Sequence, residues 1–139
     1  MLSDKDLKII EQIKQNSRAS VRDIASATGL RPSTVHSRIK KLTKDKTIEK
    51  FTVKLNNEAV EEDFIVFVLL RSEKDIDNKI FKNAAVKEVF GITGEYDLLL
   101  KLKFSNINEF NNFIISFRKD NKLTKTLTMI STTVIKEEI

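Results

Sequence analysis

The 139-residue sequence contains no cysteine and no tryptophan, and only one proline, one histidine and three glycines. Without cysteine the chain has no disulfide, no zinc–thiolate site and no catalytic thiolate. A single histidine argues against a histidine-based metal site or catalytic triad. No phosphate-binding loop or nucleophile–base pair is recognisable either. We therefore expect no metal, no cofactor and no enzymatic activity.

Long hydrophobic runs are also missing. No apolar stretch approaches the ~20 residues that a membrane-spanning helix needs. The N-terminus, MLSDKDLKII, is charged from the fourth residue and has no signal-peptide core. With 40% apolar and 32% charged residues, the composition is that of a folded protein. We expect it to be cytoplasmic and to have no membrane partner.

The charge is unevenly distributed along the chain. Residues 1–55 carry 13 Lys and Arg against 6 Asp and Glu, whereas residues 56–139 carry 12 against 14. A basic first part joined to a mildly acidic second part indicates two domains with different partners. A polyanion is the simplest partner for the basic part. Surface lysines that only keep the protein soluble are the alternative.

Three helical patterns occupy the first 50 residues. The first follows the N-cap Ser3 and should bury the stripe Leu7, Ile9, Ile10 and Ile13. The second begins after Ser20, with Asp23 completing a capping box, and ends at Gly29 in the left-handed conformation. The third starts at Pro32, which suits the first position of a helix. Two helices joined so tightly must cross steeply, which predicts a helix-turn-helix.

The third helix has two different faces. Val35, Ile39 and Leu42 define its core side. Small hydroxyl side chains and then lysines lie on the opposite side: Ser33, Ser37, Lys40, Lys41 and Lys44. Thr34 and His36 lie on the flanks. The early residues suit base edges in the major groove of DNA, and the later cations suit phosphates. A merely solvated outer face is the alternative.

The remaining chain changes to a mixed pattern. In FTVKL at 51–55, apolar and polar residues alternate, which predicts a strand. An acidic linker follows. Residues 51–62 are therefore expected to join two domains, at 1–50 and 63–139. Strands are predicted at 64–70, on both sides of Gly94, and at 124–136. Helices are predicted at 75–86 and 106–119. The order βαββαβ predicts an α+β, ferredoxin-like domain: an antiparallel sheet with both helices on one face.

The strand FIVFVLL, from Phe64 to Leu70, is apolar on both sides, whereas a sheet with one solvated face should alternate. The excess predicts that a second copy of the chain covers the face opposite the helices. We expect Ile65, Phe67, Leu69 and Leu99 to lie in that interface. A central strand that is simply over-hydrophobic is the alternative.

The first part of the chain, RASVRDIASATGLRPSTVHSRIKKL, resembles the DNA-binding half of the leucine-responsive/asparagine regulator (Lrp/AsnC) family of bacteria and archaea, in particular its archaeal members. The resemblance implies a winged helix-turn-helix and a double-stranded DNA partner. Two positions depart from the family pattern: Arg31 replaces the usual serine N-cap, and Lys46 replaces a glycine. The predicted DNA-binding set is Arg18, Ser20, Arg22, Arg31, Ser33, Thr34, His36, Ser37, Arg38, Lys40, Lys41 and Lys44.

A second motif extends the resemblance over nearly the whole chain. VFGITGEYDLLLKL looks like the family's effector-sensing domain, whose G-x-Y-D motif corresponds here to Gly94, Glu95, Tyr96 and Asp97. The resemblance implies that a free amino acid or related metabolite binds between subunits near this turn. Backbone N–H groups of a glycine turn can hold a carboxylate, and Asp97 can hold an ammonium. The alternative is that Asp97 only caps its own backbone.

Together these features predict a homodimeric or higher-order transcriptional regulator that an amino acid modulates. An architectural, chromatin-like protein that coats DNA with little sequence preference is one alternative. A small-molecule-binding regulatory subunit that binds no DNA is another.

Overall fold

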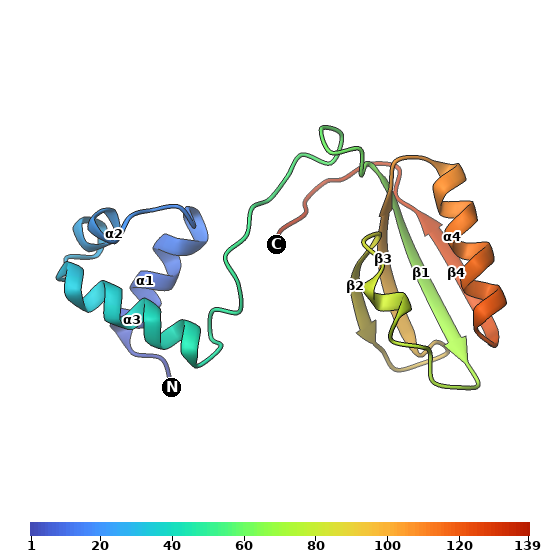
Figure 1. Ribbon diagram of the computed structural model, residues 1–139, viewed down its shortest axis with the longest axis horizontal. Coiled ribbons are helices and arrows are strands. Elements are labelled where there is room, and N and C mark those ends of the chain that lie inside the picture. The colour runs from blue at the N-terminus through green and yellow to red at the C-terminus, as the bar shows by residue number, and fades with distance from the viewer. The chain divides into compact units, whose positions relative to one another are not determined.

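The structure, a computed structural model, describes all residues from 1 to 139 and separates the chain into two units (Figure 1). The first unit comprises Met1–Lys54 with Ile139, and the second comprises Leu55–Glu138. The first contains only helices, and the second contains a sheet and one long helix. This division confirms the predicted α+β architecture of a helical part followed by a sheet-containing part.

The first unit consists of α1 (Asp4–Gln15), α2 (Val21–Thr28) and α3 (Pro32–Lys44). Ser3 and Ser20 cap α1 and α2, each with an aspartate three residues later completing a capping box. Gly29 ends α2 with φ of 72°, the left-handed conformation that glycine adopts at little cost. Pro32 then starts α3 after only two residues. These local signals confirm the predicted helix-turn-helix.

The structure shows an unfavourable local feature at each of the two positions that depart from the family pattern, Arg31 and Lys46. Arg31 at the N-cap of α3 makes no side-chain capping hydrogen bond. Such a missing cap typically costs a helix about 1 kcal/mol. Lys46, just after α3, has φ of 57°, a left-handed conformation that is unfavourable for a side chain with a Cβ.

The core of the first unit is formed by Ile9, Ile24, Ala25 and Val35. The predicted stripe on α1 is wrong at Leu7, which is 53% exposed. The buried side chain on that turn is instead Asp6, which completes the cap at Ser3. The inner face of α1 is therefore rotated by about one residue from the apolar pattern.

The predicted strand at 51–55 is not formed, and no strand follows α3 before residue 64. Phe51, Val53 and Leu55 are exposed. A strand requires a neighbour to satisfy its backbone N–H and C=O groups, and no strand of this chain pairs with these residues. The alternating pattern is present, but a wing is absent from the first unit.

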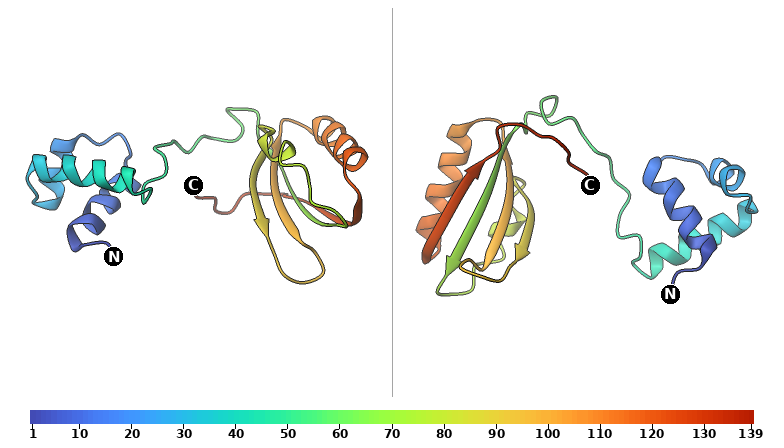
Figure 2. Two further views of the ribbon diagram at one scale, coloured as in Figure 1. Left: turned by 60° about the horizontal axis from the view of Figure 1, so that its bottom comes forward. Right: turned by 180° about the vertical axis from the view of Figure 1, so that it is seen from behind.

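The second unit is built on a four-stranded antiparallel sheet (Figure 2). Its strands are β1 (Phe64–Ser72), β2 (Val86–Gly91), β3 (Leu98–Phe104) and β4 (Leu123–Ile130). They lie in the order β2-β3-β1-β4, with the pairing irregular between Val86 and Glu88 and between Arg71 and Ser72. This order is the ferredoxin-like arrangement that the sequence predicts.

The helix predicted at 75–86 is wrong: only one short turn, η1 (Ile80–Lys82), is helical there. The side chains of Asp77 and Asn83 accept hydrogen bonds from backbone N–H groups two residues later. Such local bonds compete with a helix. Ile80 and Phe81 still pack against the core, so these apolar side chains reach it although the segment forms no long helix.

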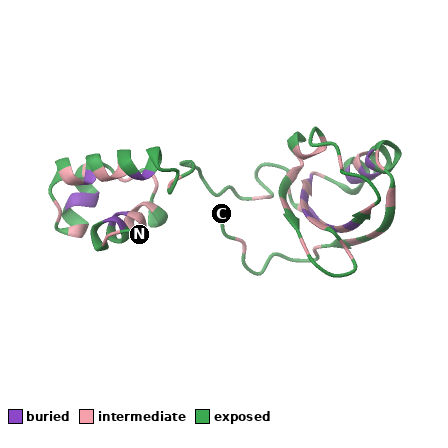
Figure 3. Ribbon diagram, turned by 90° about the horizontal axis from the view of Figure 1, so that it is seen from below, coloured by how far each residue is buried: buried purple, intermediate pink, exposed green.

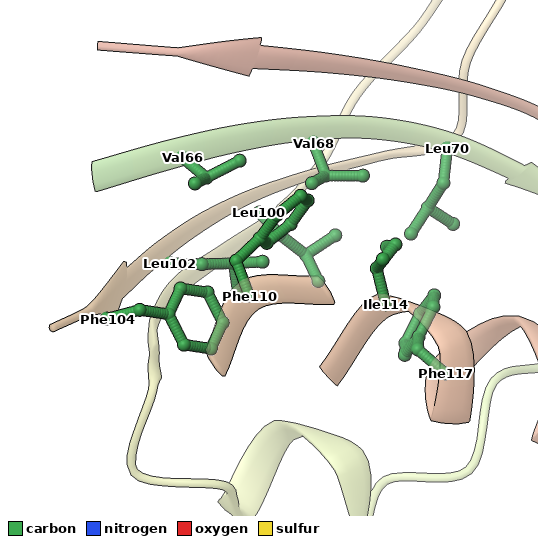
Figure 4. Close-up of a cluster of buried hydrophobic side chains, with 9 residues drawn as sticks. All are labelled: Val66, Val68, Leu70, Leu100, Leu102, Phe104, Phe110, Ile114 and Phe117. Atoms are coloured by element: carbon green, nitrogen blue, oxygen red, sulfur yellow. The ribbon is translucent and has the colours of Figure 1, made fainter. Parts of the chain in front are cut away.

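The other predicted helix is present as α4 (Ile107–Asp120), which covers one face of the sheet. Figure 3 shows that burial is concentrated inside each unit. In Figure 4 the buried side chains of β1, β3 and α4 converge: Val66, Val68, Leu70, Leu100, Leu102, Phe104, Phe110, Ile114 and Phe117. Ile107, at the start of α4, is half exposed.

The opposite face of the sheet has no helix. Phe67 and Leu69 of β1 lie on this face, paired with Lys101 and Leu99 of β3. Phe90 pairs with Leu99 on one side, and Leu127 pairs with Leu69 on the other. The apolar patch formed by Phe67, Leu69, Phe90, Leu99, Leu127 and Met129 is called the open face below.

Candidate nucleic-acid interface and effector turn

The outer face of α3 has the character that the sequence predicts. Val35 and Leu42 are buried on the inner side, and Ile39 is half-buried. The hydroxyls of Ser33 and Ser37 and the three lysines are exposed, as is His36, whereas Thr34 is half-buried. The helix therefore presents small polar groups at its start and cations at its end.

The three lysines of this face differ in their partners. The ammonium of Lys41 lies 3.1 Å from the carboxylate of Asp45, one turn further on. Lys40 and Lys44 form no ion pair. These two cations are consequently freer to meet an external anion than Lys41 is. The hydroxyl of Ser37 donates to the carbonyl of Thr34 at 3.1 Å, which leaves its oxygen able to accept.

Four further residues of the predicted DNA-binding set lie near the turn and helix starts. Arg18, Arg22 and Arg31 are exposed. The Ser20 hydroxyl is already used, because it accepts the N–H of Asp23 in the capping box.

Arg38 differs from the other cations of α3. It lies on the flank of the helix, half-buried, with Nη1 3.7 Å from Oδ1 of Asp6 in α1. The sequence pattern places Asp6 in the first turn of α1 but gives no indication of this contact.

The predicted effector residues form the connection between β2 and β3. Gly94 has φ of 118°, which side chains with a Cβ rarely adopt. Asp97 closes the turn: its N–H donates to the Leu70 carbonyl at 2.8 Å, and its carbonyl accepts the N–H of Ile92 at 2.9 Å. Its carboxylate accepts the N–H of Ser72 at 3.4 Å. Asp97 therefore has a structural role in the turn, whatever else it binds.

Lys125 of β4 joins the turn from the neighbouring strand. Its ammonium lies 2.9 Å from the Glu95 carboxylate and 5.0 Å from the centre of the Tyr96 ring. The hydrogen bond from Lys125 lowers the pKa of Glu95, and the same bond raises the pKa of Lys125. The turn thus gathers one cation, two carboxylates and one aromatic ring.

A partly buried ionic cluster on the sheet was not predicted. Lys101 and Lys103 of β3 share the carboxylate of Glu137, from the C-terminal tail formed by residues 131–138. Asn57 donates to the same carboxylate at 3.2 Å and accepts from Lys103 at 2.7 Å. The only sequence signal was the pair of lysines at alternate positions in LLLKLKF, on the side of the strand opposite its buried leucines.

These donors hold Glu137 firmly in its ionised form. The hydrogen bond from Lys101 is the largest influence, and with Lys103 and Asn57 it lowers the pKa of Glu137 to about 2 despite burial. The tail also contacts the sheet through the N–H of Ser131, which donates to the Ile65 carbonyl at 2.9 Å.

No group of three or more histidine, aspartate or glutamate side chains is placed to hold a metal ion. None of the helices has the length and apolar composition to span a membrane.

Two family models match the two units. A winged helix-turn-helix DNA-binding model matches residues 2–49, and the Lrp/AsnC ligand binding domain matches residues 62–139. The HTH-type transcriptional regulator FL11 of Pyrococcus furiosus is 35% identical, covering 99% of this chain and 93% of the relative. An HTH-type transcriptional regulator of Pyrococcus horikoshii is 33% identical over 100% of this chain and 98% of its own length.

Solved structures of low sequence identity share the fold. An AsnC family transcriptional regulator from Agrobacterium tumefaciens aligns with a TM-score of 0.90 at 21% identity, covering 98% of this chain and 94% of that chain. A transcriptional regulator from Neisseria meningitidis, solved in complex with L-Met, aligns with a TM-score of 0.87 at 23% identity, covering 99% and 94%.

Proposed function

Because the chain belongs to the Lrp/AsnC family of DNA-binding transcriptional regulators, we propose that it acts in the cytoplasm as a homo-oligomer with α3 as its recognition helix. In this role it performs no enzymatic reaction. Ser33, Ser37 and their neighbours Thr34 and His36 read base edges in the major groove. Lys40 and Lys44 contact phosphates as α3 leaves the groove.

The observation that supports this proposal best is the outer face of α3. Its hydroxyls and two unpaired lysines are exposed on a helix whose opposite side is held in the core of the first unit. Backbone-positioning contacts and base-reading contacts need different side chains, and this helix supplies both in the required order. The remaining residues of the predicted set, Arg18, Ser20, Arg22, Arg31, Arg38 and Lys41, are proposed to contribute phosphate contacts around it.

The open face supports the proposal that copies of the chain associate. Phe90, Leu127 and Met129 are each more than 40% exposed, and the half-buried Phe67, Leu69 and Leu99 lie among them. A contiguous exposed apolar patch marks an interaction site more often than a solvated surface. A second copy is the proposed cover. Ile65, which was also expected in the interface, is already 2% exposed within one chain.

We also propose that an amino acid modulates DNA binding. Two solved relatives of the fold, from Neisseria meningitidis and M. tuberculosis, were crystallised with L-methionine. The proposed site is the Gly94–Asp97 turn, between subunits, where backbone N–H groups suit a carboxylate and Asp97 suits an ammonium. A ligand can shift DNA affinity only by its differential affinity for two states of the protein.

Selection of retained DNA fragments at moderate salt is the direct test. The expected result is a near-palindromic motif bound much more tightly than random DNA. A ratio of specific to non-specific affinity near one would instead indicate an architectural protein. Failure to bind any DNA at low salt would indicate a regulatory subunit and contradict the proposal.

A further inference from the structure

A groove with a volume of about 710 Å³ lies between α4 and the segment from Asp77 to Ala85. That segment forms only the short turn η1 where a long helix was predicted, and it leaves one face of α4 uncovered. Ligand pockets commonly measure about 300–1,000 Å³ and combine apolar walls with a few polar groups. The groove has the size of such a pocket.

The floor of the groove is aromatic. The ring centre of Phe113 lies 5.5 Å from that of Phe104 and 5.7 Å from that of Phe117. Phe104 and Phe117 are buried, and Phe113 is half-buried. Ile80 and Ala85 extend the apolar surface from the opposite wall. Methylene groups pack well on such a surface, and the faces of aromatic rings attract organic cations.

The charged side chains that line the groove are three carboxylates and one ammonium: Asp77, Glu109, Asp120 and Lys79. Their net charge is −2, and Lys79 forms no ion pair. Two further cations of the last turn of α4, Arg118 and Lys119, line the neighbouring hollow and not this groove. A cation with more than one charge offsets this net charge, whereas an anion, a neutral molecule or a zwitterion does not.

The carboxylates of α4 are far apart. Glu109 and Asp120 are separated by 11 positions of the same helix, which is about 16 Å along its axis. Asn112, Phe113 and Ser116 line the groove between them. One small ion cannot contact both carboxylates, and no group of acidic side chains is placed to hold a metal ion. The spacing instead suits an elongated molecule with a positive charge at each end.

The carboxylates are oriented before any ligand arrives. Oε2 of Glu109 accepts the N–H of Ser105 at 3.1 Å, and Oδ1 of Asp77 accepts the N–H of Lys79 at 2.9 Å. Each carboxylate keeps its other oxygen for a ligand. Asp120 ends α4, where the last backbone carbonyl groups also favour a cation. Groups that are already in place lose less entropy when they bind.

From this geometry we propose that the groove binds an aliphatic polyamine. The terminal ammonium groups pair with Glu109 and Asp120, and the methylene segments lie on the aromatic floor. An inner ammonium lies over the ring of Phe113, where Asn112 and Ser116 can accept its N–H groups. This site lies on the α4 side of the sheet, and the inference is independent of the amino-acid modulation proposed above.

The test is isothermal titration of the full-length chain with spermine, a linear tetra-amine. DNA is left out because its phosphates bind polyamines themselves. We expect one spermine per chain. Butylamine, which has a single charge, should bind at least tenfold more weakly. Magnesium chloride at equal charge should not displace spermine. Displacement by magnesium would indicate only diffuse screening of acidic side chains and would overturn the inference.

Variants of the groove test the proposed contacts. Asp120→Asn and Glu109→Gln should each weaken spermine binding by about tenfold, because each removes a charge-assisted hydrogen bond. Phe113→Leu keeps an apolar side chain but removes a ring face and should weaken binding by about threefold. Asp75→Asn is the matched control, since it removes an exposed acid of the same segment that does not line the groove. It should change the affinity by less than twofold.

A second measurement locates spermine without any variant. The methyl NMR signals of Ile80 should shift on titration, whereas those of Ile24, in the core of the first unit, should not. Shifts at Ile24 with none at Ile80 would overturn the inference. Equal affinities of the wild type, Asp120→Asn and Glu109→Gln would also overturn it, as would the absence of binding at millimolar spermine. None of these results would bear on DNA binding by α3.

Discussion

The guanidinium of Arg38 in α3 and the carboxylate of Asp6 in α1 form an ion pair, with Nη1 3.7 Å from Oδ1. Asp6 is 6% exposed, and its Oδ1 accepts no hydrogen bond. The positive charge of Arg38 is therefore what offsets the burial of this oxygen. The other oxygen accepts from both the N–H and the hydroxyl of Ser3. One carboxylate therefore caps α1 and ties it to the proposed recognition helix.

The first prediction concerns the stability contributed by Asp6. Hydrogen bonds from Ser3, and the charge of Arg38, hold the pKa of Asp6 below its ordinary value of 3.8. The carboxylate therefore stabilises the fold above about pH 4, and this stabilisation is lost as the pH falls through the lowered native pKa. Asp6→Asn should reduce the free energy of unfolding at pH 7 by about 1–2 kcal/mol, measured by urea denaturation.

The control is Asp4→Asn, which removes an exposed acid of the same helical turn. It should change stability by only about 0.5 kcal/mol. Arg38→Gln combined with Asp6→Asn should cost less than the two single changes added together, because they break one pair. Strict additivity would show that the Arg38–Asp6 pair contributes nothing.

The second prediction concerns phosphate binding by α3. Changing Lys40 or Lys44 to alanine should weaken binding to all DNA sequences alike. For each phosphate that a subunit no longer neutralises, the slope of log affinity against log salt should fall by about 0.9. Lys41→Ala should have a smaller effect, since Asp45 already pairs with this cation. Lys82→Ala, an exposed lysine of the second unit, is the control. Equal slopes for wild type and for all three α3 variants would remove the phosphate assignment.

The third prediction concerns base reading by Ser37. Ser37→Ala should relax discrimination at one base pair of each half-site by about 1–3 kcal/mol, because a hydroxyl that contacts a base edge is removed. Site selection with the variant provides the measurement. The hydroxyl's bond to the Thr34 carbonyl lies on the exposed helix surface, so stability should hardly change. An unaltered selected motif would mean that Ser37 reads no base.

The fourth prediction concerns assembly. Leu69 lies at the centre of the open face, between Leu99 and Leu127. Leu69→Lys should bury an unpaired charge against a second copy, at a cost of several kcal/mol. Light scattering should then show a monomer, with weaker DNA binding because two half-sites are no longer linked.

Ile115→Lys serves as the matched control for assembly. Ile115 is 64% exposed on α4, which covers the other face of the sheet, so this variant should keep the oligomer. A wild-type protein that is monomeric at micromolar concentration would contradict the proposed interface directly.

The fifth prediction concerns the tail carboxylate. Because the pKa of Glu137 is lowered from 4.5 to about 2, its ionised form stabilises the fold above about pH 4.5. That contribution disappears as the pH falls toward 2. Glu137→Gln leaves Lys103 without a counter-ion and Lys101 with Glu88 alone, at 3.5 Å, and should lower stability at neutral pH by about 2–3 kcal/mol. Glu138→Gln, the neighbouring exposed residue, should be neutral. Equal stability of the two variants at pH 7 would contradict this role.

Sequence patterns predicted this fold well where local chemistry decides the outcome. Ser20, Gly29 and Pro32 mark helix boundaries through their own backbone and capping preferences, and all three occupy the predicted positions. The segment 75–86 failed because its apolar spacing was helical while Asp77 and Asn83 favoured local turns. The pattern at 51–55 failed because a strand depends on a neighbour that the sequence does not specify.

Long-range polar contacts were beyond prediction for a related reason. Glu137 and Lys101 are 36 positions apart, and Asp6 and Arg38 are 32 apart, so no helical or strand periodicity connects them. The roles proposed for the α3 residues and for Gly94–Asp97 stay predictions. Most of the first set is exposed, with Thr34 and Arg38 half-buried. The Asp97 carboxylate accepts the N–H of Ser72 in β1, so it caps the backbone of a neighbouring strand and not that of its own turn.

The two outer strands of the sheet have a further consequence for the protein's colloidal behaviour. Next to the β4 edge the pairing shifts between Arg71 and Ser72, and β4 itself carries Lys125 between Thr124 and Thr126. On the β2 edge the pairing shifts between Val86 and Glu88, beside Lys87. Lysines and bulges at a sheet margin make it a poor template for an additional strand. Concentrated solutions should therefore resist amyloid-like polymerisation through the sheet edges, although the open face of the same sheet is apolar and exposed.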